Sequence, residues 1–387
     1  MQRSMALAKG ARITGGIFCL LFFLWTATWL VVDLGQFGID GLWDAWTAQH
    51  APGRDQVTNP LQLGLAVLQL TAAFAAFAGQ RSAGGLLAVA TTLTFATAVQ
   101  VLISVGQHTS DNRWFVNADN DSSTFDGVFI SGLWLTLFAF IAGIVLLCGM
   151  REWPRQRPSD PPKRPLKAAG TVGGLLLGAM ALCYVIWHIY VVVQFEGDFF
   201  TPLYLGRGTL TSLTALAGGW ASIVFLLLTA VAALNSLMRG SAARGLGIGL
   251  GIVLFPGALL SVIAMASHDR LFKFSDEMPG MDVLNHVQLL LDLLGSLALL
   301  AMMGRGEPVA HAWYPPAQVP QFAAPGFMPP GPQGPPPAGW QPPGPPMAPP
   351  PGPPMAPPGP PMPQQVPPMP PPPQGPPPQG GFGPPQF

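Results

Sequence analysis

One acidic residue interrupts a long apolar stretch near the end of the chain. The stretch reads NHVQLLLDLLGSLALL over residues 285–300, and Asp292 is its one charged residue. At 100° per residue, an α-helix there would carry its polar side chains on one face and its leucines on the others. If the helix crosses a membrane, this polar stripe faces protein rather than lipid. Its members are Asn285, Gln288, Asp292 and Ser296.

A carboxylate at the centre of a bilayer costs about 2.5–3.5 kcal/mol on insertion scales, so it is neutral, hydrogen-bonded or paired. Apart from Arg244, at the first position of one apolar stretch, no Lys or Arg lies within the apolar stretches of this chain. We therefore expect Asp292 to be a protonated or proton-exchanging carboxyl. Its expected partner is a glutamine of a neighbouring helix, Gln62, Gln69 or Gln100. The alternative is a hydrogen bond between helices with no further role.

The histidines form a second set of candidates. Five of the six fall on or just below one predicted membrane surface, and imidazoles gathered at one depth could ligate copper, zinc or haem iron. The candidate ligands are His108, His188, His268 and His286. No local spacing such as His-x-x-x-His supports them, so no cofactor is predicted and the metal is unknown. Haem or copper remains the alternative to histidines that only form hydrogen bonds.

Other catalytic patterns do not occur in the sequence. It has no nucleophile elbow, no His-Glu-x-x-His, no phosphate-binding loop and no paired carboxylates in one apolar stretch. The charge balances to zero, which argues against a broad nucleic-acid-binding face. The three cysteines all lie in apolar runs, as buried hydrophobic residues do. We therefore predict no catalytic residues and a protein that is not an enzyme.

Composition indicates a membrane protein. Hydrophobic residues make up 49% of the chain and charged residues only 9%, against about 25% charged residues in soluble domains. Apolar runs long enough to cross about 30 Å of hydrocarbon must be helical, because their backbone has to satisfy its own hydrogen bonds. Eight such spans are predicted, at 14–32, 61–79, 84–106, 127–149, 169–194, 209–237, 244–266 and 283–303.

The basic residues predict the orientation. With the N-terminus inside, thirteen Lys and Arg fall on inner segments and five on outer ones, as the positive-inside rule requires. Both termini are then cytoplasmic. The preference for Arg over Lys suggests a GC-rich bacterial genome, so the predicted location is a bacterial plasma membrane. After the first span, Trp43 and Trp46 lie one turn apart in what we expect to be an interfacial helix on the outer side.

The two halves follow one plan, which predicts an internal duplication. Each half has four spans, and a short Arg-bearing turn joins its second and third spans. His108 aligns with His268, and Trp25 with Trp187. Four spans per half place both repeats in the same orientation. The predicted parts are a first four-helix membrane repeat (1–150), a basic cytoplasmic linker (151–167), a second repeat (168–304) and a tail (305–387).

Glycines in the seventh span are spaced for close helix packing. Residues 245–251 read GLGIGLG, which gives the overlapping pairs Gly245/Gly249 and Gly247/Gly251. Small residues four apart let two helix backbones approach each other in a membrane. We expect these pairs to lie at helix contacts.

The tail differs in composition from the rest of the chain. From Pro308 onward it contains 36 of the 46 prolines and no charged residue, and GPPMAPP occurs twice. Glycine is not every third residue, so collagen is excluded. We expect a disordered cytoplasmic tail rich in polyproline II, which acts either as a spacer or as a ligand for aromatic-lined grooves of cytoplasmic proteins.

Three functions follow as hypotheses for this all-α polytopic membrane protein. The first is an anchoring or organising protein whose proline-rich tail recruits cytoplasmic partners. The second is a proton-coupled transporter or channel that uses Asp292. The third is a haem- or metal-binding membrane protein that uses the outer histidines. The lipid bilayer is the expected partner in each, nucleic acid is not, and the oligomeric state is left open.

Overall fold

A computed structural model describes residues 5–47, 49, 56–107, 114–116, 123–152, 163–195, 197–271, 273–274 and 279–308. Within these residues, eight helices are long and apolar enough to cross a membrane, which confirms the prediction of an all-helical, multi-pass membrane protein. They are α1 (Lys9–Trp46), α2 (Pro60–Phe77), α3 (Ala83–Ser104), α4 (Ser123–Cys148), α5 (Lys167–Gln194), α6 (Gly218–Leu237), α7 (Ala243–Ser267) and α8 (Pro279–Met303). The predicted tail begins at residue 305, but residues 306–308 form a strand of the membrane body, and residues 309–387 lie outside the described residues.

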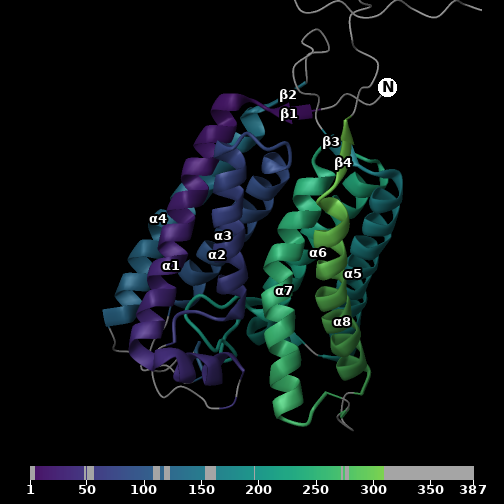
Figure 1. Ribbon diagram of the computed structural model, residues 1–387. Helices are drawn as coiled ribbons and strands as arrows, with labels where there is room; N and C mark the ends of the chain where they lie inside the picture. The colour runs from purple at the N-terminus through teal and green to yellow at the C-terminus, as the bar shows by residue number, and fades with distance from the viewer. Residues whose placement is uncertain are drawn as a thin grey trace, which may run out of the picture. The chain divides into compact units, whose positions relative to one another are not determined.

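The helices form two groups of four (Figure 1). In each group, every helix packs against the next one, and the fourth packs back against the first: α1 to α4 in one group, α5 to α8 in the other. The groups meet where α7 packs against α2 and α3. Leu68 of α2, Leu87 of α3 and Leu250 of α7 are fully buried in the main hydrophobic core.

A short antiparallel strand pair closes each group. Strand β1 (Met5–Leu7), which precedes α1, pairs with β2 (Met150–Glu152), which follows α4. In the same way β3 (Lys163–Pro165), which precedes α5, pairs with β4 (Gly306–Pro308), which follows α8. All four strands lie at one end of the helices (Figure 1). We call this end the strand side and the opposite end the loop side.

The α2–α3 and α6–α7 turns, both on the strand side, have one geometry. The N–H of Gln80 donates to the carbonyl of Ala75 at 2.8 Å, and the N–H of Gly240 donates to that of Asn235 at 2.7 Å. The preceding residue has a left-handed backbone in each turn, with φ 70° at Gly79 and φ 54° at Arg239. This combination is the Schellman motif, which ends many α-helices.

The contact between the two groups depends on glycines. A Cβ atom on Gly245 of α7 would lie 2.8 Å from the Cα of Gly85 of α3, so the two backbones touch there. A Cβ on Gly64 of α2 would lie 2.5 Å from the carbonyl oxygen of Val253 of α7. The predicted glycine pairs divide between two contacts. Gly245 and Gly249 face the first group, whereas Gly247 and Gly251 face α8.

We therefore expect Gly245→Ala to destabilise the protein. The added methyl group meets backbone atoms that cannot rotate away, and overpacking of this kind costs roughly 1–3 kcal/mol. Gly178→Ala in α5 is the matched control, because a Cβ there meets nothing within 4 Å. The free energy of unfolding in detergent micelles should fall for the first variant and stay equal or rise for the second. Equal values for both would contradict the backbone contact.

The sixth helix begins later than the sequence predicted. The expected span was 209–237, but α6 starts at Gly218 and residues 206–217 are not helical. These residues, which we call the plug, include the buried Leu210, Leu213 and Thr214. The plug is apolar because it is buried, not because it is helical. The first helix is longer than predicted: it bends at Gly38 (φ 70°) and continues to Trp46, so Trp43 lies on a helical segment as expected.

Hydrogen bonds fasten the plug to the first group. Gln100 of α3 donates to the carbonyl of Leu205 at 2.8 Å and accepts from the N–H of Ala217 at 3.4 Å, so one side chain joins both ends of the plug. Gln62 of α2 donates to the carbonyl of Thr214 at 2.9 Å. The N–H of Thr214 donates to the carbonyl of Val57 at 3.0 Å. Buried backbone groups without helix partners thereby gain partners.

The buried carboxylate of Asp33 in α1 fixes the segment to which the plug binds. Its oxygens accept from the N–H of Val57 at 3.1 Å, from the N–H of Thr58 at 2.6 Å and from the Thr58 hydroxyl at 2.5 Å. Three donors satisfy a carboxylate that is removed from water. Asp33 is therefore a structural acid.

On the strand side, Glu307 of β4 forms ion pairs with two other parts of the second group. It accepts from Nε of Arg164 in β3 at 2.7 Å and from the guanidinium of Arg239 in the α6–α7 turn. Burial by itself raises the pKa of Glu307, but the hydrogen bond from Arg164 and the positive charges of Arg239 and Arg164 outweigh it, so the pKa lies below its ordinary value. The ionised form is the one that the fold stabilises.

This shift predicts how the β3–β4 pair responds to acid. A lowered pKa means that the stabilisation is complete above the ordinary glutamate pKa and is lost as the pH falls through the lowered value. Hydrogen exchange of the 163–166 backbone should be slower in the native protein than in Glu307→Gln at neutral pH. The two should converge in acid. A difference that persists in strong acid would exclude the ion pairs as its cause.

Candidate functional site

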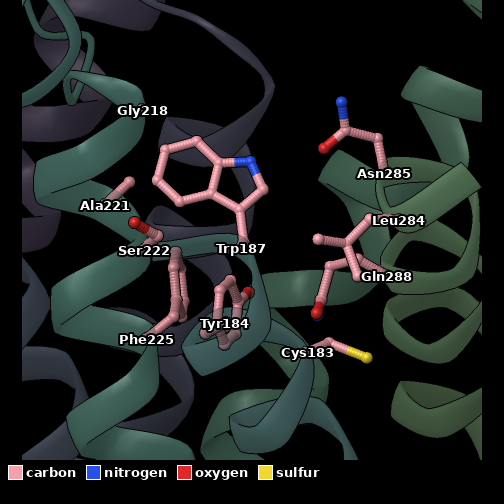
Figure 2. Close-up of a pocket in the computed structure, with 10 residues that line it drawn as sticks. All are labelled: Cys183, Tyr184, Trp187, Gly218, Ala221, Ser222, Phe225, Leu284, Asn285 and Gln288. Carbon is pink, nitrogen blue, oxygen red and sulfur yellow. The ribbon is translucent and has the colours of Figure 1, made fainter. Parts of the chain in front are cut away.

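A pocket with a volume of roughly 220 Å³ lies between α5, α6 and α8, near the ends of these helices on the loop side. Each helix contributes residues three or four positions apart, so each presents one face to the pocket. Figure 2 shows the lining side chains: Cys183, Tyr184 and Trp187 of α5, Gly218, Ala221, Ser222 and Phe225 of α6, and Leu284, Asn285 and Gln288 of α8.

Aromatic rings form the α5–α6 wall. Tyr184 and Phe225 stack with ring centroids 6.4 Å apart and an angle of 14° between their planes. The indole of Trp187 extends between this wall and the α8 side chains, with Asn285 opposite it (Figure 2). Offset stacking of this kind gives a rigid wall with electron-rich faces. The pocket therefore has aromatic faces on one side and amide groups on the other.

A hydrogen-bonded chain lies behind the aromatic wall. Nδ1 of His188 lies 2.7 Å from the hydroxyl of Tyr204, and Nε2 lies 3.1 Å from Oγ of Ser222, which lines the pocket. Ser222 donates its proton to the carbonyl of Gly219 at 2.8 Å. His188 consequently donates from Nε2 to Ser222 and accepts at Nδ1 from Tyr204. Burial raises the pKa of Tyr204, which keeps that phenol protonated as a donor.

Two local features hold Tyr204 in this position. It belongs to η2 (Thr201–Leu205), the short helical segment before the plug. Its ring stacks on His188 with centroids 5.6 Å apart and packs against Gly219, where a Cβ would lie 2.6 Å from the ring. Any larger residue at position 219 would displace Tyr204.

Asp292 lies just beyond the pocket, halfway along α8. Nε2 of Gln288, which lines the pocket, donates to Oδ1 of Asp292 at 2.7 Å. The carboxyl is partly buried and lies within electrostatic reach of Cys183 and Tyr184. The neighbouring helix α5 carries Lys only at its first residue, α8 carries no Lys or Arg, and the one such residue of α7, Arg244, binds the carbonyls of Met303 and Gly304 at the far end of α8. Asp292 therefore has an amide partner and no cationic one in these helices.

The predicted polar stripe is only partly turned inward. Asn285 is exposed, Gln288 and Asp292 are partly buried, and Ser296 is fully buried and donates to the carbonyl of Leu293. The expected glutamine partners of Asp292 were wrong. Gln62 and Gln100 bind the plug and its edges, and Gln69 donates to Thr94 and accepts from Thr26. Gln288, one turn away on the same helix, occupies that role.

The histidines in the described part of the chain have separate surroundings. His188 joins Tyr204 to Ser222, whereas Nδ1 of His286 donates to the carbonyl of Asp282 at 2.6 Å. His268 lies at the C-terminal end of α7, and His108 lies outside the described residues. Within the described ranges, no three His, Cys, Asp or Glu side chains gather into a group that could hold a metal ion.

Sequence reasoning missed Tyr204 and Ser222. Ser222 comes one turn after the glycine pair that opens α6 and could have been flagged as a polar residue in an apolar helix. Tyr204 had no such signal, because its position depends on the plug. Comparisons with protein families, curated proteins and solved structures find no match to this chain.

Proposed function

We propose that this membrane protein binds a small molecule in the α5–α6–α8 pocket and that the proton on Asp292 controls the binding, as in a proton-coupled transporter. One observation carries the proposal: Gln288 both lines the pocket and donates to the Asp292 carboxylate. The amide therefore joins a titratable group to a binding site. The outer histidines give no comparable support to a metal or haem protein.

The amide supplies a physical mechanism for this coupling. While Asp292 is ionised, Nε2 of Gln288 donates to it, and Oε1 has no hydrogen-bond partner among the described residues. A protonated Asp292 gains an O–H donor, and in our proposal the amide rotates so that the unpartnered Oε1 accepts from it. This rotation of the Gln288 amide turns Nε2 toward the pocket in place of Oε1, so the pocket loses a hydrogen-bond acceptor and gains a donor. A ligand that needs the acceptor then binds only when Asp292 is ionised.

We also infer that the two groups of helices arose by duplication and that the strand side is cytoplasmic. The matching strand pairs, the two identical turns and the contact of Gly85 with Gly245 support the duplication. The positive-inside count supports the orientation. One alignment between the repeats changes. Gly16 packs on Phe77 in the same way as Gly174 packs on Leu237, so Gly16 corresponds to Gly174. Counted from this pair, Trp25 corresponds to Cys183 and not to Trp187.

The two repeats would then differ at the site. Register along β2 and β4 places Thr136 where Asp292 stands, and Trp25 occupies the place of Cys183. Trp25 packs against the main core, and Thr136 bonds to its own helix at the carbonyl of Gly132. The second repeat alone combines the acid with small pocket residues, so binding would be specific to it.

Asp292→Asn should remove the proton control. The protein, in lipid nanodiscs, is screened by thermal unfolding against small neutral, cationic and anionic compounds over a range of pH. A bound compound stabilises the fold by about 2.7 kcal/mol at a hundred times its Kd. We expect stabilisation that changes with pH in the native protein and in the control Asp40→Asn, an exposed acid. In Asp292→Asn the stabilisation should be the same at every pH.

Filling the pocket provides the second control. Ala221→Trp should remove the stabilisation, whereas Val231→Trp, on the lipid-facing side of the same helix, should keep it. Infrared difference spectra test the coupling without a ligand. In the native protein, the carboxyl band of Asp292 and the amide band of Gln288 should both change with pH. In Asp292→Asn, both of these changes should be absent. An amide band that ignores the state of Asp292 would refute the proposal.

A second candidate, the organising protein, is favoured by the way the tail begins. Glu307 and the β3–β4 pair fix the chain at Pro308, next to the basic residues Arg164 and Arg239. The tail would therefore leave the membrane body at one defined point on the strand side. An anchored tail of this kind suits the recruitment of cytoplasmic proteins.

Truncation after Pro308 tests this candidate and leaves β4 intact. If the tail recruits partners, the cytoplasmic proteins that co-purify with native membranes should be lost on truncation. They should also be lost when a Gly/Ser-rich segment of equal length replaces residues 309–387, because that segment lacks polyproline II structure. Asp292→Asn should leave them in place. Retention with the Gly/Ser segment would show that the tail sequence is not recognised.

A further inference from the structure

We propose that the ligand of the α5–α6–α8 pocket is a small organic ammonium ion, a protonated amine on an aromatic or compact apolar body. This inference rests on the proposed function and names its ligand class. Four observations carry it: the aromatic wall, the unpartnered amide oxygen, the acid that this amide binds and the size of the pocket.

The aromatic wall suits a cation. Trp187, Tyr184 and Phe225 present ring faces or edges to one space (Figure 2). A cation above such a face is attracted by the ring quadrupole, most strongly by Trp and most of all where water is excluded. The stacked pair Tyr184–Phe225 also offers apolar surface to the body of the ligand.

Two oxygen atoms at the pocket can accept hydrogen bonds from the N–H groups of a ligand. Oε1 of Gln288 is buried and has no hydrogen-bond partner within the described part of the chain. Ser222 donates to Gly219 and accepts from His188, which leaves one lone pair on its oxygen for a further donor. An ammonium group supplies the donors that these oxygens accept. A buried acceptor left without a donor lowers the stability of the protein, so binding a donor there recovers stability.

The charge of the surroundings has the matching sign. None of the ten lining residues is Lys, Arg or His, and Asp292 lies directly behind Gln288. From α5, Cys183 and Tyr184 face Asp292. From α7, no titratable residue occurs between Arg244 and His268. The cation would thus meet Asp292 behind Gln288 and no Lys, Arg or His among the residues that line the pocket.

The volume of roughly 220 Å³ limits the size of the ligand. Pockets for drug-sized ligands measure about 300–1,000 Å³. The site therefore accommodates an amine with a single ring or a short branched chain, not a peptide or a lipid headgroup with its tails. Because the cation prefers an ionised Asp292, a proton and the ammonium ion compete, and binding strengthens as the pH rises while the amine stays protonated.

The experiment uses Cys183 as a reporter. Cys148 is exposed and Cys19 is buried, so the full chain with Cys148→Ser presents Cys183 to a small maleimide through the pocket. The alkylation rate is measured with and without benzylammonium, and with benzyl alcohol and benzoate as neutral and anionic analogues of nearly equal size. Rates are compared as ratios at each pH, so the pH dependence of the thiol reaction cancels.

We expect benzylammonium to protect Cys183 with an affinity at least about tenfold above that of benzyl alcohol, a ratio that matches a desolvated cation–aromatic contact. Benzoate should give no protection. Protection by benzylammonium should increase with pH in the native sequence. In Asp292→Asn it should weaken about tenfold and lose its pH dependence, while the effect of benzyl alcohol stays unchanged.

Equal protection by all three compounds would overturn the ammonium proposal and leave the pocket as a binding site. Protection by benzoate alone would overturn it as well. No protection by any of them would exclude this ligand class, and the infrared coupling of Asp292 to Gln288 would still decide the proposed function independently. Ala221→Trp must abolish any protection; if protection persists, the compounds act elsewhere and the proposal fails.

Discussion

A buried backbone that is not helical must find hydrogen-bond partners outside itself, and this constraint shapes the loop side of the protein. Between its two end residues, the plug, residues 206–217, has no helical hydrogen bonds to satisfy its N–H and carbonyl groups. The first group of helices supplies them through Gln62, Gln100 and the backbone that Asp33 holds in place. The second group is consequently complete only when it is packed against the first.

The pocket depends on the same contact. Because Gln100 joins both ends of the plug, it sets where α6 begins and where Tyr204 lies. Tyr204 in turn orients His188, and His188 holds Ser222 at the pocket wall. On the far side of α7, the contact of Gly245 with Gly85 sets the distance between the groups. A site built from α5, α6 and α8 thus depends on residues of α2 and α3 that never touch it.

The sequence predicts the helices better than the site. Hydropathy identifies all eight spans because lipid requires apolar surface and internal hydrogen bonds together. It fails at 209–217, since burial in protein and burial in lipid select the same composition. The Gln288–Asp292 bond was accessible from sequence, because residues four apart on a helix are neighbours. The chain from Tyr204 to Ser222 was not, since it needs the tertiary position of a non-helical segment.

Asp292 decides between a structural and a functional interpretation of the pocket. Asp33 shows what a structural acid looks like here: full burial and three donors. Asp292 has one amide donor, stands mid-helix, and adjoins a pocket with an unpartnered acceptor. An ionised acid that costs about 2.5–3.5 kcal/mol in the membrane is compensated only in part by one hydrogen bond to a charged group, worth about 1.5–3 kcal/mol. Under the proposed function, a proton or a cation would supply the remaining stabilisation, and exchange between the two would couple the ligand to pH.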